Sequence, residues 1–344
     1  MPQENKYNLS IIIPVFNEEN YLEPLFKDLK KYFNYEDVEV IVVSDGSYDN
    51  SNSILKKLKK NSYVFEYQLI ILKRNFGKGY AVREGAKQSS GKYLLLQDAD
   101  LELDVKDSKE IYEIIKNDEE IECIFGSRYM SGKLKKHNYF INELIGKINT
   151  LIFNLLFGQS LSDIHCGLKI FSRDVYKKIN LSVNDFGLEI DIAAQIIKNN
   201  YFIYEVGVSY FSRTVNAGKK ITWVDGLKSY YYLFKARFLD NPTSTLVSII
   251  ISSIYMTFVG SYFGLGLGNT VFMIVFFLIG LIIGLHTKIL SSMSIFLFIY
   301  LGSLFGNGQG KVLSVLSFFI LGIYLVNKIK KVVKKNYSNL NYLF

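Results

Sequence analysis

Cysteine, proline and tryptophan are scarce in this 344-residue chain, which holds two Cys, four Pro and one Trp. The two cysteines, Cys123 and Cys166, are too few for the disulfide framework of a small secreted domain, and they indicate a reducing compartment. The first residues also lack a secretory signal pattern, because the apolar run Leu9–Val15 is short for such a segment. We therefore expect the front of the chain to stay in the cytosol.

Acidic residues and arginine are absent from residue 241 onward, where the only Lys, Arg, Asp or Glu side chains are seven lysines. The first 240 residues hold the other 33 of the 40 basic groups and all 32 acidic groups, so the net charge of +8 comes mostly from the tail. A nucleic-acid-binding protein normally carries its surplus charge on a basic folded domain. We therefore expect no nucleic-acid partner, and the 49% hydrophobic content excludes disorder over most of the chain.

Long uncharged runs dominate this tail and predict four membrane spans. A spanning helix needs about 20 mainly apolar residues, and the runs fit spans near 243–263, 267–287, 289–308 and 311–328. Lysines tend to stay on the cytoplasmic side, and Lys288 and the cluster at 328–335 follow the second and fourth spans. We expect a multi-pass integral membrane protein with domains 1–240 and 241–344, and with the front domain and the C-terminus in the cytoplasm.

The front domain alternates short apolar runs with helical patterns, which predicts an α/β domain with a mostly parallel sheet and flanking helices. The predicted strands are Leu9–Val15, Val38–Val43, Gln68–Leu72, Lys92–Leu96 and Glu122–Phe125. The predicted helices between and after them are Glu18–Phe33, Asp49–Lys60, Gly79–Gln88 and Val105–Lys116. Ligands of such sheets bind at the carboxyl ends of the strands, and polar residues follow the strands here.

Three carboxylates after the fourth predicted strand carry the sharpest chemical signal. Asp98, Asp100 and Glu102 alternate along the chain, so on an extended or turning segment they can converge. Hard oxygen ligands suit Mg²⁺ or Mn²⁺, which leave positions for phosphate oxygens. A rival interpretation is a dinucleotide site at Gly77-Lys78-Gly79, but Val82 stands where such a site has its third glycine.

Four motifs together resemble the family 2 inverting glycosyltransferases of GT-A fold: Ser10–Glu18, Val43–Ser47, Asn75–Gly79 and Asp98-Ala99-Asp100. Further motifs are similar to the branch that uses polyprenyl phosphates, such as dolichyl-phosphate glucosyltransferases and mannose synthases: Gly126–Arg128, Asp163–Phe171, Arg213 and Gly218–Lys220. One departure is Ser44, where the family usually has a first Asp before Asp45. The resemblance implies transfer of a hexose from UDP-glucose or GDP-mannose to dolichyl or undecaprenyl phosphate.

The resemblance also implies a role for each matching residue. Pro14, Asn17, Glu18, Asp45, Lys78 and Asp98 would bind the nucleotide sugar, with Asp45 accepting a hydrogen bond from the base. The metal, Mg²⁺ or Mn²⁺, would lie on Asp98, Asp100 and Glu102. Arg128, Arg213 and Lys220 would bind the acceptor and its phosphates. Asp100, Arg128 and Asp163 are the expected catalytic residues, although the role of Asp163 stays open.

A lipid acceptor implies an active site at the membrane surface. The segment 140–157 has apolar residues at helical spacing and follows three lysines, so we expect an interfacial helix there, and a second one at 221–238. Two other functions stay open: a processive polysaccharide synthase, whose Gln-x-x-Arg-Trp pattern is absent, and a lipid-flippase or transport subunit with a nucleotide-sensing domain. The sequence leaves open whether the chain forms a homo-oligomer.

Overall fold

The computed structural model describes residues 7–34, 36–60, 66–130, 132–136, 139–214 and 223–239, together with helical residues at 250, 252–254, 256–257, 274–280, 317, 320 and 324. The chain divides into two compact units, Met1–Phe234 and Lys235–Phe344. In the second unit the structure describes the π-helix η2 (Lys235–Leu239) and the short helical pieces after it. The four predicted spans therefore lie almost wholly outside the described residues, as does Lys220, and they stay predictions.

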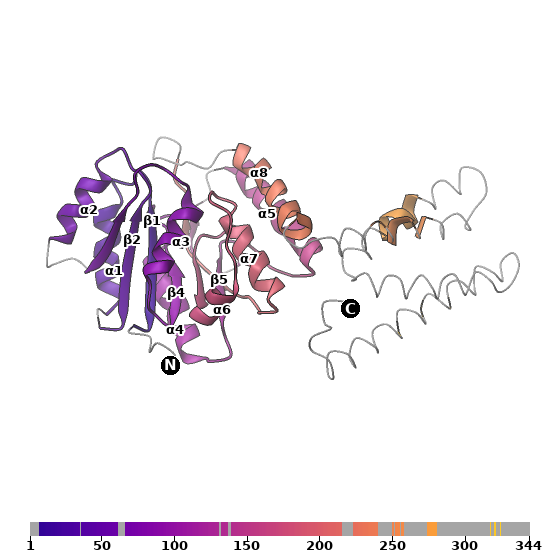
Figure 1. The fold of residues 1–344 in the computed structure, drawn as a ribbon, viewed down its shortest axis with the longest axis horizontal. Coiled ribbons are helices and arrows are strands. Elements are labelled where there is room, and N and C mark those ends of the chain that lie inside the picture. Colours follow the sequence, from indigo (N-terminus) through magenta and orange to yellow (C-terminus); the bar gives the residue numbers. More distant parts are fainter. Residues whose placement is uncertain are drawn as a thin grey trace, which may run out of the picture. The chain divides into compact units, whose positions relative to one another are not determined.

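Seven strands form one sheet in the first unit, in the order β3-β2-β1-β4-β7-β5-β8 (Figure 1). Their bounds are β1 Leu9–Val15, β2 Val38–Ser44, β3 Tyr67–Ile71, β4 Tyr93–Leu96, β5 Cys123–Ser127, β7 Lys169–Ser172 and β8 Tyr204–Gly207. β7 is antiparallel to both β4 and β5, and the other four pairings are parallel. The mostly parallel sheet is confirmed. Two short strands, β6 (Lys135–Lys136) and β9 (Tyr210–Phe211), pair separately.

Eight α-helices connect or flank the strands among the described residues of this unit. They are α1 Leu22–Tyr32, α2 Ser51–Lys59, α3 Lys78–Gln88, α4 Val105–Asn117, α5 Phe140–Phe157, α6 Arg173–Lys178, α7 Leu188–Lys198 and α8 Trp223–Phe234. Local chemistry sets several of their ends: the Asp104 carboxylate accepts the Lys106 N–H at the start of α4, and Gly158 closes α5 in the left-handed region.

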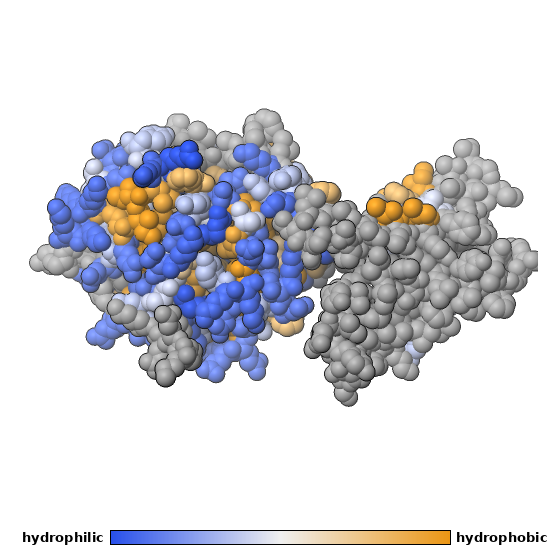
Figure 2. Space-filling view, viewed as in Figure 1, coloured by the Kyte–Doolittle hydropathy of each residue, from blue (hydrophilic) through white to orange (hydrophobic). Residues whose placement is uncertain are grey.

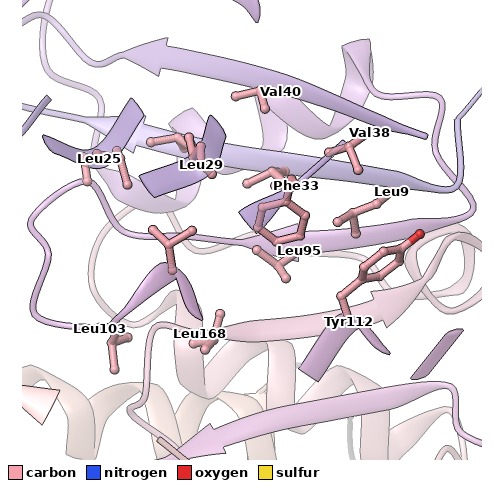
Figure 3. Close-up of a cluster of buried hydrophobic side chains, with 14 of the residues drawn as sticks. Leu9, Leu25, Leu29, Phe33, Val38, Val40, Leu95, Leu103, Tyr112 and Leu168 are labelled. Carbon is pink, nitrogen blue, oxygen red and sulfur yellow. The ribbon is translucent and has the colours of Figure 1, made fainter. Parts of the chain in front are cut away.

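The core lies on both faces of the sheet because β1 and β2 are apolar on both sides, as expected of central parallel strands. On one face Leu9 and Val38 pack against Leu29 of α1, Phe33 just after α1, and Tyr112 of α4 (Figure 3). On the other face Ile41 and Val43 pack against Ala81 of α3. These two layers fix the carboxyl ends of β1, β2 and β4 beside one another, where the functional residues lie.

The surface of the first unit is mixed in character. On the face seen in Figure 2, hydrophilic residues predominate and small apolar patches lie between them. Helix α5 differs: among the described helices it is the one long and apolar enough to cross a membrane by length and composition, with only 17% of it buried. Its outward face carries an apolar stripe, defined by Phe140, Ile141, Leu144, Ile148, Leu151 and Leu155, all exposed.

Candidate active site

One cavity of about 490 Å³ opens at the carboxyl ends of β1, β2 and β4. Nine of the residues predicted as site residues line it: Pro14, Glu18, Asp45, Lys78, Asp98, Asp100, Glu102, Arg128 and Arg213. Among the described residues, Asn17 and Asp163 lie behind its wall. The sheet thus gathers residues that are far apart in the sequence, because parallel strands end at one edge.

Asn17 joins the loops after β1 and β2. It adopts a left-handed backbone conformation with φ of 51°, which Asn tolerates better than most residues. Its side-chain oxygen accepts the Tyr48 N–H at 3.0 Å, and its own N–H donates to the Ser47 hydroxyl at 3.1 Å. Asn17 therefore shapes the cavity rim from behind.

Asp45 is buried and holds the turn that precedes α3. Its two carboxylate oxygens accept the backbone N–H groups of Phe76 and Gly77, each at 2.8 Å. Gly77 has a φ of 100°, and a Cβ there would collide with the carbonyl oxygen of Asn184. The carboxylate of Asp45 is thus engaged with the protein's own backbone, and a contact with a nucleobase stays a prediction.

Lys78 opens α3 and forms a bridge between two carboxylates. Its Nζ lies 2.7 Å from Asp98 Oδ1 and 2.7 Å from Glu189 Oε1, at the start of α7. Burial lowers the pKa of Lys78, but the two carboxylates outweigh burial and raise the pKa above its ordinary value. Lys78 therefore stays protonated and supplies a fixed positive charge beside Asp98.

The segment Asp98–Glu102 is a turn whose three carboxylates line one cavity, and the Arg213 guanidinium lies 2.9 Å from Asp100 Oδ2 and 3.5 Å from Glu102 Oε1. Leu101 has a φ of 56°, and Asp100 Oδ1 accepts the Glu102 N–H at 3.0 Å. Glu102 also accepts the Tyr210 hydroxyl at 3.0 Å and the backbone N–H of Arg213 at 2.8 Å. Among the described residues, no group of three His, Cys, Asp or Glu is placed to hold a metal ion.

Arg213 is the second cation of the cavity and joins three segments. Its guanidinium lies 2.8 Å from Glu18 Oε2 and 2.9 Å from Asp100 Oδ2. Burial lowers the pKa of Arg213, but the surrounding carboxylates, Asp100 first, raise it above its ordinary value. The side chain that was expected to contact phosphates is thus bound to carboxylates in this structure.

Asp100 is the carboxyl group of this cluster whose pKa is raised. Burial first, and then the nearby charge of Asp98, raise the pKa of Asp100 to about 7 against the opposing effect of Arg213. Two neighbouring carboxylates in a cavity are an oxygen donor set that suits Mg²⁺, which is commonly bound by one or two carboxylates with water and phosphate completing its shell. The residues present therefore fit a divalent cation held by Asp98 and Asp100, while a contact of Glu102 with the ion stays a prediction.

Arg128 and Asp163 form a buried ion pair at the other end of the cavity. The Asp163 oxygens accept from Arg128 Nε at 2.7 Å and Nη2 at 2.9 Å. Burial raises the pKa of Asp163, but the Arg128 guanidinium overcomes it and holds the pKa below its usual range. Glu205 of β8 fixes the Asp163 segment by accepting its N–H at 3.0 Å. Arg128 lines the cavity, and Asp163 orients it from behind.

Two residues that the sequence did not single out, Asn149 and His165, complete the wall beside Arg128. Asn149 lies on the inner face of α5, and its Nδ2 is 3.3 Å from His165 Nε2. Burial lowers the pKa of His165 to about 4, so its ring is neutral at physiological pH. The sequence signal for Asn149 was its place opposite the apolar stripe of α5.

Comparison with known proteins finds relatives of this chain. Residues 10–180 match the model of the family described as Glycosyl transferase family 2. The chain is 29% identical over 222 residues to a dolichyl-phosphate beta-glucosyltransferase of Dictyostelium discoideum, covering 61% of this chain and 68% of that protein. It is 28% identical over 242 residues to the protein of the same description from Saccharomyces cerevisiae, covering 64% and 71%.

A solved structure shares the fold. It is glucosyl-3-phosphoglycerate synthase from Mycobacterium tuberculosis, in complex with Mn²⁺, UDP and glucosyl-3-phosphoglycerate. Its TM-score is 0.51 with 14% sequence identity, and the match covers 67% of this chain and 80% of that one. This similarity shows that the first unit has the GT-A fold.

Proposed function

We propose that this chain, which carries a glycosyl transferase family 2 domain, transfers glucose from UDP-glucose to a polyprenyl phosphate such as dolichyl or undecaprenyl phosphate. The observation that carries the proposal is the cavity itself. It runs from Asp45 and Gly77 past Asp98 and Asp100 to Arg128, and its far wall is the polar face of α5. The two relatives are named as dolichyl-phosphate beta-glucosyltransferases, which favours this donor and acceptor.

Asp98 and Asp100 would hold Mg²⁺ or Mn²⁺ in this proposal, as supported by their oxygen donors and by the Mn²⁺ in the structurally similar synthase. A bound divalent cation supplies positive charge that stabilises the departing diphosphate. Lys78 adds a second fixed positive charge next to Asp98. Pro14, Glu18 and Asp45 line the end of the cavity assigned to the nucleoside.

Arg128 binds the acceptor phosphate in this proposal. A phosphate monoester has a second pKa near 6, so it reaches the site as an anion and needs no base to remove a proton. Arg128 lines the cavity while Asp163 fixes its orientation, which leaves a planar cation facing the acceptor. The attack on the anomeric carbon then comes from the side opposite the diphosphate and inverts the configuration. Lys220 lies outside the described residues, and its contact with phosphate is part of the proposal.

Helix α5 rests on the membrane surface in this proposal. Its apolar stripe faces outward, and its other face lines the cavity, so a lipid chain in the bilayer keeps its phosphate within reach of the site. We further propose domains 1–240 and 241–344, with a second interfacial helix near 221–238, and a multi-pass membrane protein whose front domain and C-terminus are cytoplasmic.

The test is a transfer assay on membranes that contain the whole chain. The expected product from labelled UDP-glucose and polyprenyl phosphate is a single glucosyl lipid, and Asp100→Asn membranes serve as the control. A long labelled polymer would instead establish a processive synthase. Absence of any labelled lipid from a panel of UDP- and GDP-sugars would contradict the proposed function.

A further inference from the structure

The polar side chains on the inner face of α5 differ in whether all their donor and acceptor atoms have hydrogen-bond partners. Asn154 exchanges two hydrogen bonds with the backbone of Leu161, at 2.8 and 3.0 Å. The Thr150 hydroxyl donates to the Gly146 carbonyl oxygen at 2.9 Å and accepts the Ile164 N–H at 3.4 Å. Asn149 is 1% exposed, yet its Oδ1 has no hydrogen-bond partner among the described residues. A buried amide oxygen without a partner is uncommon and calls for an explanation.

The partner of Asn149, His165, is held in place from several sides. The Lys169 ammonium group donates to the carbonyl oxygens of Ile164 and Cys166. The backbone N–H of His165 donates to Asp163 Oδ1 at 3.2 Å. Lys169 is fully buried on β7. The imidazole and the Asn149 amide therefore form a polar pair in the cavity wall, on a backbone that these hydrogen bonds hold in place. Which amide atom is oxygen is an assignment, but one atom always pairs with His165 and leaves the other unpaired.

This polar pair lies between the two ends of the proposed reaction. Gly167, two residues after His165, packs against the Asp98 carboxylate and the Lys78 ammonium group, where the diphosphate is proposed to lie. Asp163, two residues before His165, holds Arg128, where the acceptor phosphate is proposed to lie. In a direct transfer the sugar must lie between the leaving diphosphate and the attacking phosphate, so the segment 163–167 borders the sugar.

We propose that Asn149 and His165 form the subsite that hydrogen-bonds a hydroxyl group of the transferred hexose. This inference rests on the proposed function and extends it to a residue pair that selects the sugar. An amide and a neutral imidazole donate to and accept from hydroxyl groups. A site that hydrogen-bonds a substrate hydroxyl also discriminates strongly against donors that lack it.

The test compares two affinities of the whole chain in detergent with Mg²⁺, those for UDP-glucose and for UDP, by titration calorimetry. Asn149→Leu keeps the side-chain volume and removes the unsatisfied buried oxygen, so it should fold. We expect it to weaken UDP-glucose binding about 3- to 10-fold, the usual effect of one hydrogen bond, and to leave UDP binding unchanged. Thr150→Val is the matched control, because Thr150 is the next residue on α5 but does not line the cavity, and it should leave both affinities unchanged.

Deoxy donors identify the hydroxyl group. For one of the 2-, 3-, 4- and 6-deoxy forms of UDP-glucose, the wild type should bind several-fold more weakly, and that difference should vanish in Asn149→Leu. If Asn149→Leu changes neither affinity, or weakens UDP and UDP-glucose equally, the subsite is refuted. If the wild type binds UDP-glucose but transfers it to another acceptor, the proposed function fails while the subsite stands. If it binds no UDP-sugar, both fail.

Discussion

At the scale of single residues, the Arg128–Asp163 pair separates two mechanisms. Asp163 is fully buried with both oxygens on Arg128, so Asp163→Asn leaves a buried cation without its counter-charge. Breaking such a pair costs about 3–5 kcal/mol. We expect a lower melting temperature and slower transfer in Asp163→Asn, and slower transfer in Arg128→Lys because the planar two-pronged contact is lost.

The double variant Arg128→Gln/Asp163→Asn is the control for this pair. It replaces the two charges by neutral groups, so we expect the melting temperature to recover while transfer stays slow. A variant Asp163→Asn that keeps its melting temperature but loses all transfer, beside an active Arg128→Ala, would show that Asp163 acts as a base.

The carboxylates of Asp98 and Asp100 predict that glucose transfer depends on a divalent cation. We expect EDTA to stop glucose transfer and Mg²⁺ or Mn²⁺ to restore it, and Asp100→Asn to lower the rate by about 10²–10³-fold. Glu102→Gln should lower it less, because the Glu102 carboxylate already accepts hydrogen bonds from Tyr210 and Arg213. Undiminished transfer in EDTA would remove the metal from the proposal, and equal losses in the two variants would restore the three-carboxylate site.

The lowered pKa of His165 predicts that the folded chain loses stability in acid. Its pKa is lowered from 6.5 to about 4 in the folded chain, so between these values the unfolded chain binds a proton that the folded chain does not. Stability therefore falls as the pH drops from 6.5 to 4, by roughly 3 kcal/mol at most. His165→Gln should lose less melting temperature than the wild type between pH 7 and pH 4.5. Equal losses would mean that His165 titrates normally.

The residue types of the site were predictable from the sequence, whereas their pairing was not. Asp98, Asp100 and Arg128 follow strands whose ends must meet, so their place on the cavity wall follows from strand patterning. The contacts of Glu102 with Tyr210 and Arg213 were not predictable, because Leu101 takes a left-handed conformation, which no local residue preference indicates for leucine. The bond from Arg213 to Glu18 joins residues 195 positions apart, and only the folded sheet brings them together.

At the scale of elements, the apolar runs located the first five strands to within two residues at each end, from Leu9–Val15 to Cys123–Ser127. The later strand β7 was missed because Lys169–Ser172 is only four residues long and contains a buried lysine. Its antiparallel direction depends on the long connection through α5, which carries no sequence signal for direction. That same connection places Gly167 next to Asp98.

The apolar stripe of α5 predicts that this helix lies deeper in the membrane than α4 does. We expect a bimane label at Leu151→Cys on the apolar stripe to be quenched strongly by lipids brominated on their acyl chains. The same label at Lys116→Cys, on α4, should be quenched weakly. Cys123 and Cys166 are buried, so they should react little with the label. Equal quenching at the two positions would show that the apolar stripe does not contact lipid.

At the scale of the whole molecule, the distribution of charge predicts the topology. All acidic groups lie in the first 240 residues, and the tail has only lysines, of which five fall between 328 and 335. Lysines near span ends favour the cytoplasmic side by the positive-inside rule. An even number of spans therefore keeps the catalytic unit and Phe344 on the same side, where nucleotide sugars are made available by the cytosol.

This arrangement predicts the accessibility of a tag placed after Phe344. In intact cells an impermeant reagent should fail to label the tag, and labelling should appear once the membrane is permeabilised. A second tag in the uncharged loop predicted at 264–269 gives the control, because a loop between the first two spans must face outward and be labelled in intact cells. Labelling of the Phe344 tag in intact cells would require an odd number of spans, and the lysine cluster at 328–335 would then lie outside, against the charge rule that defines the four-span proposal.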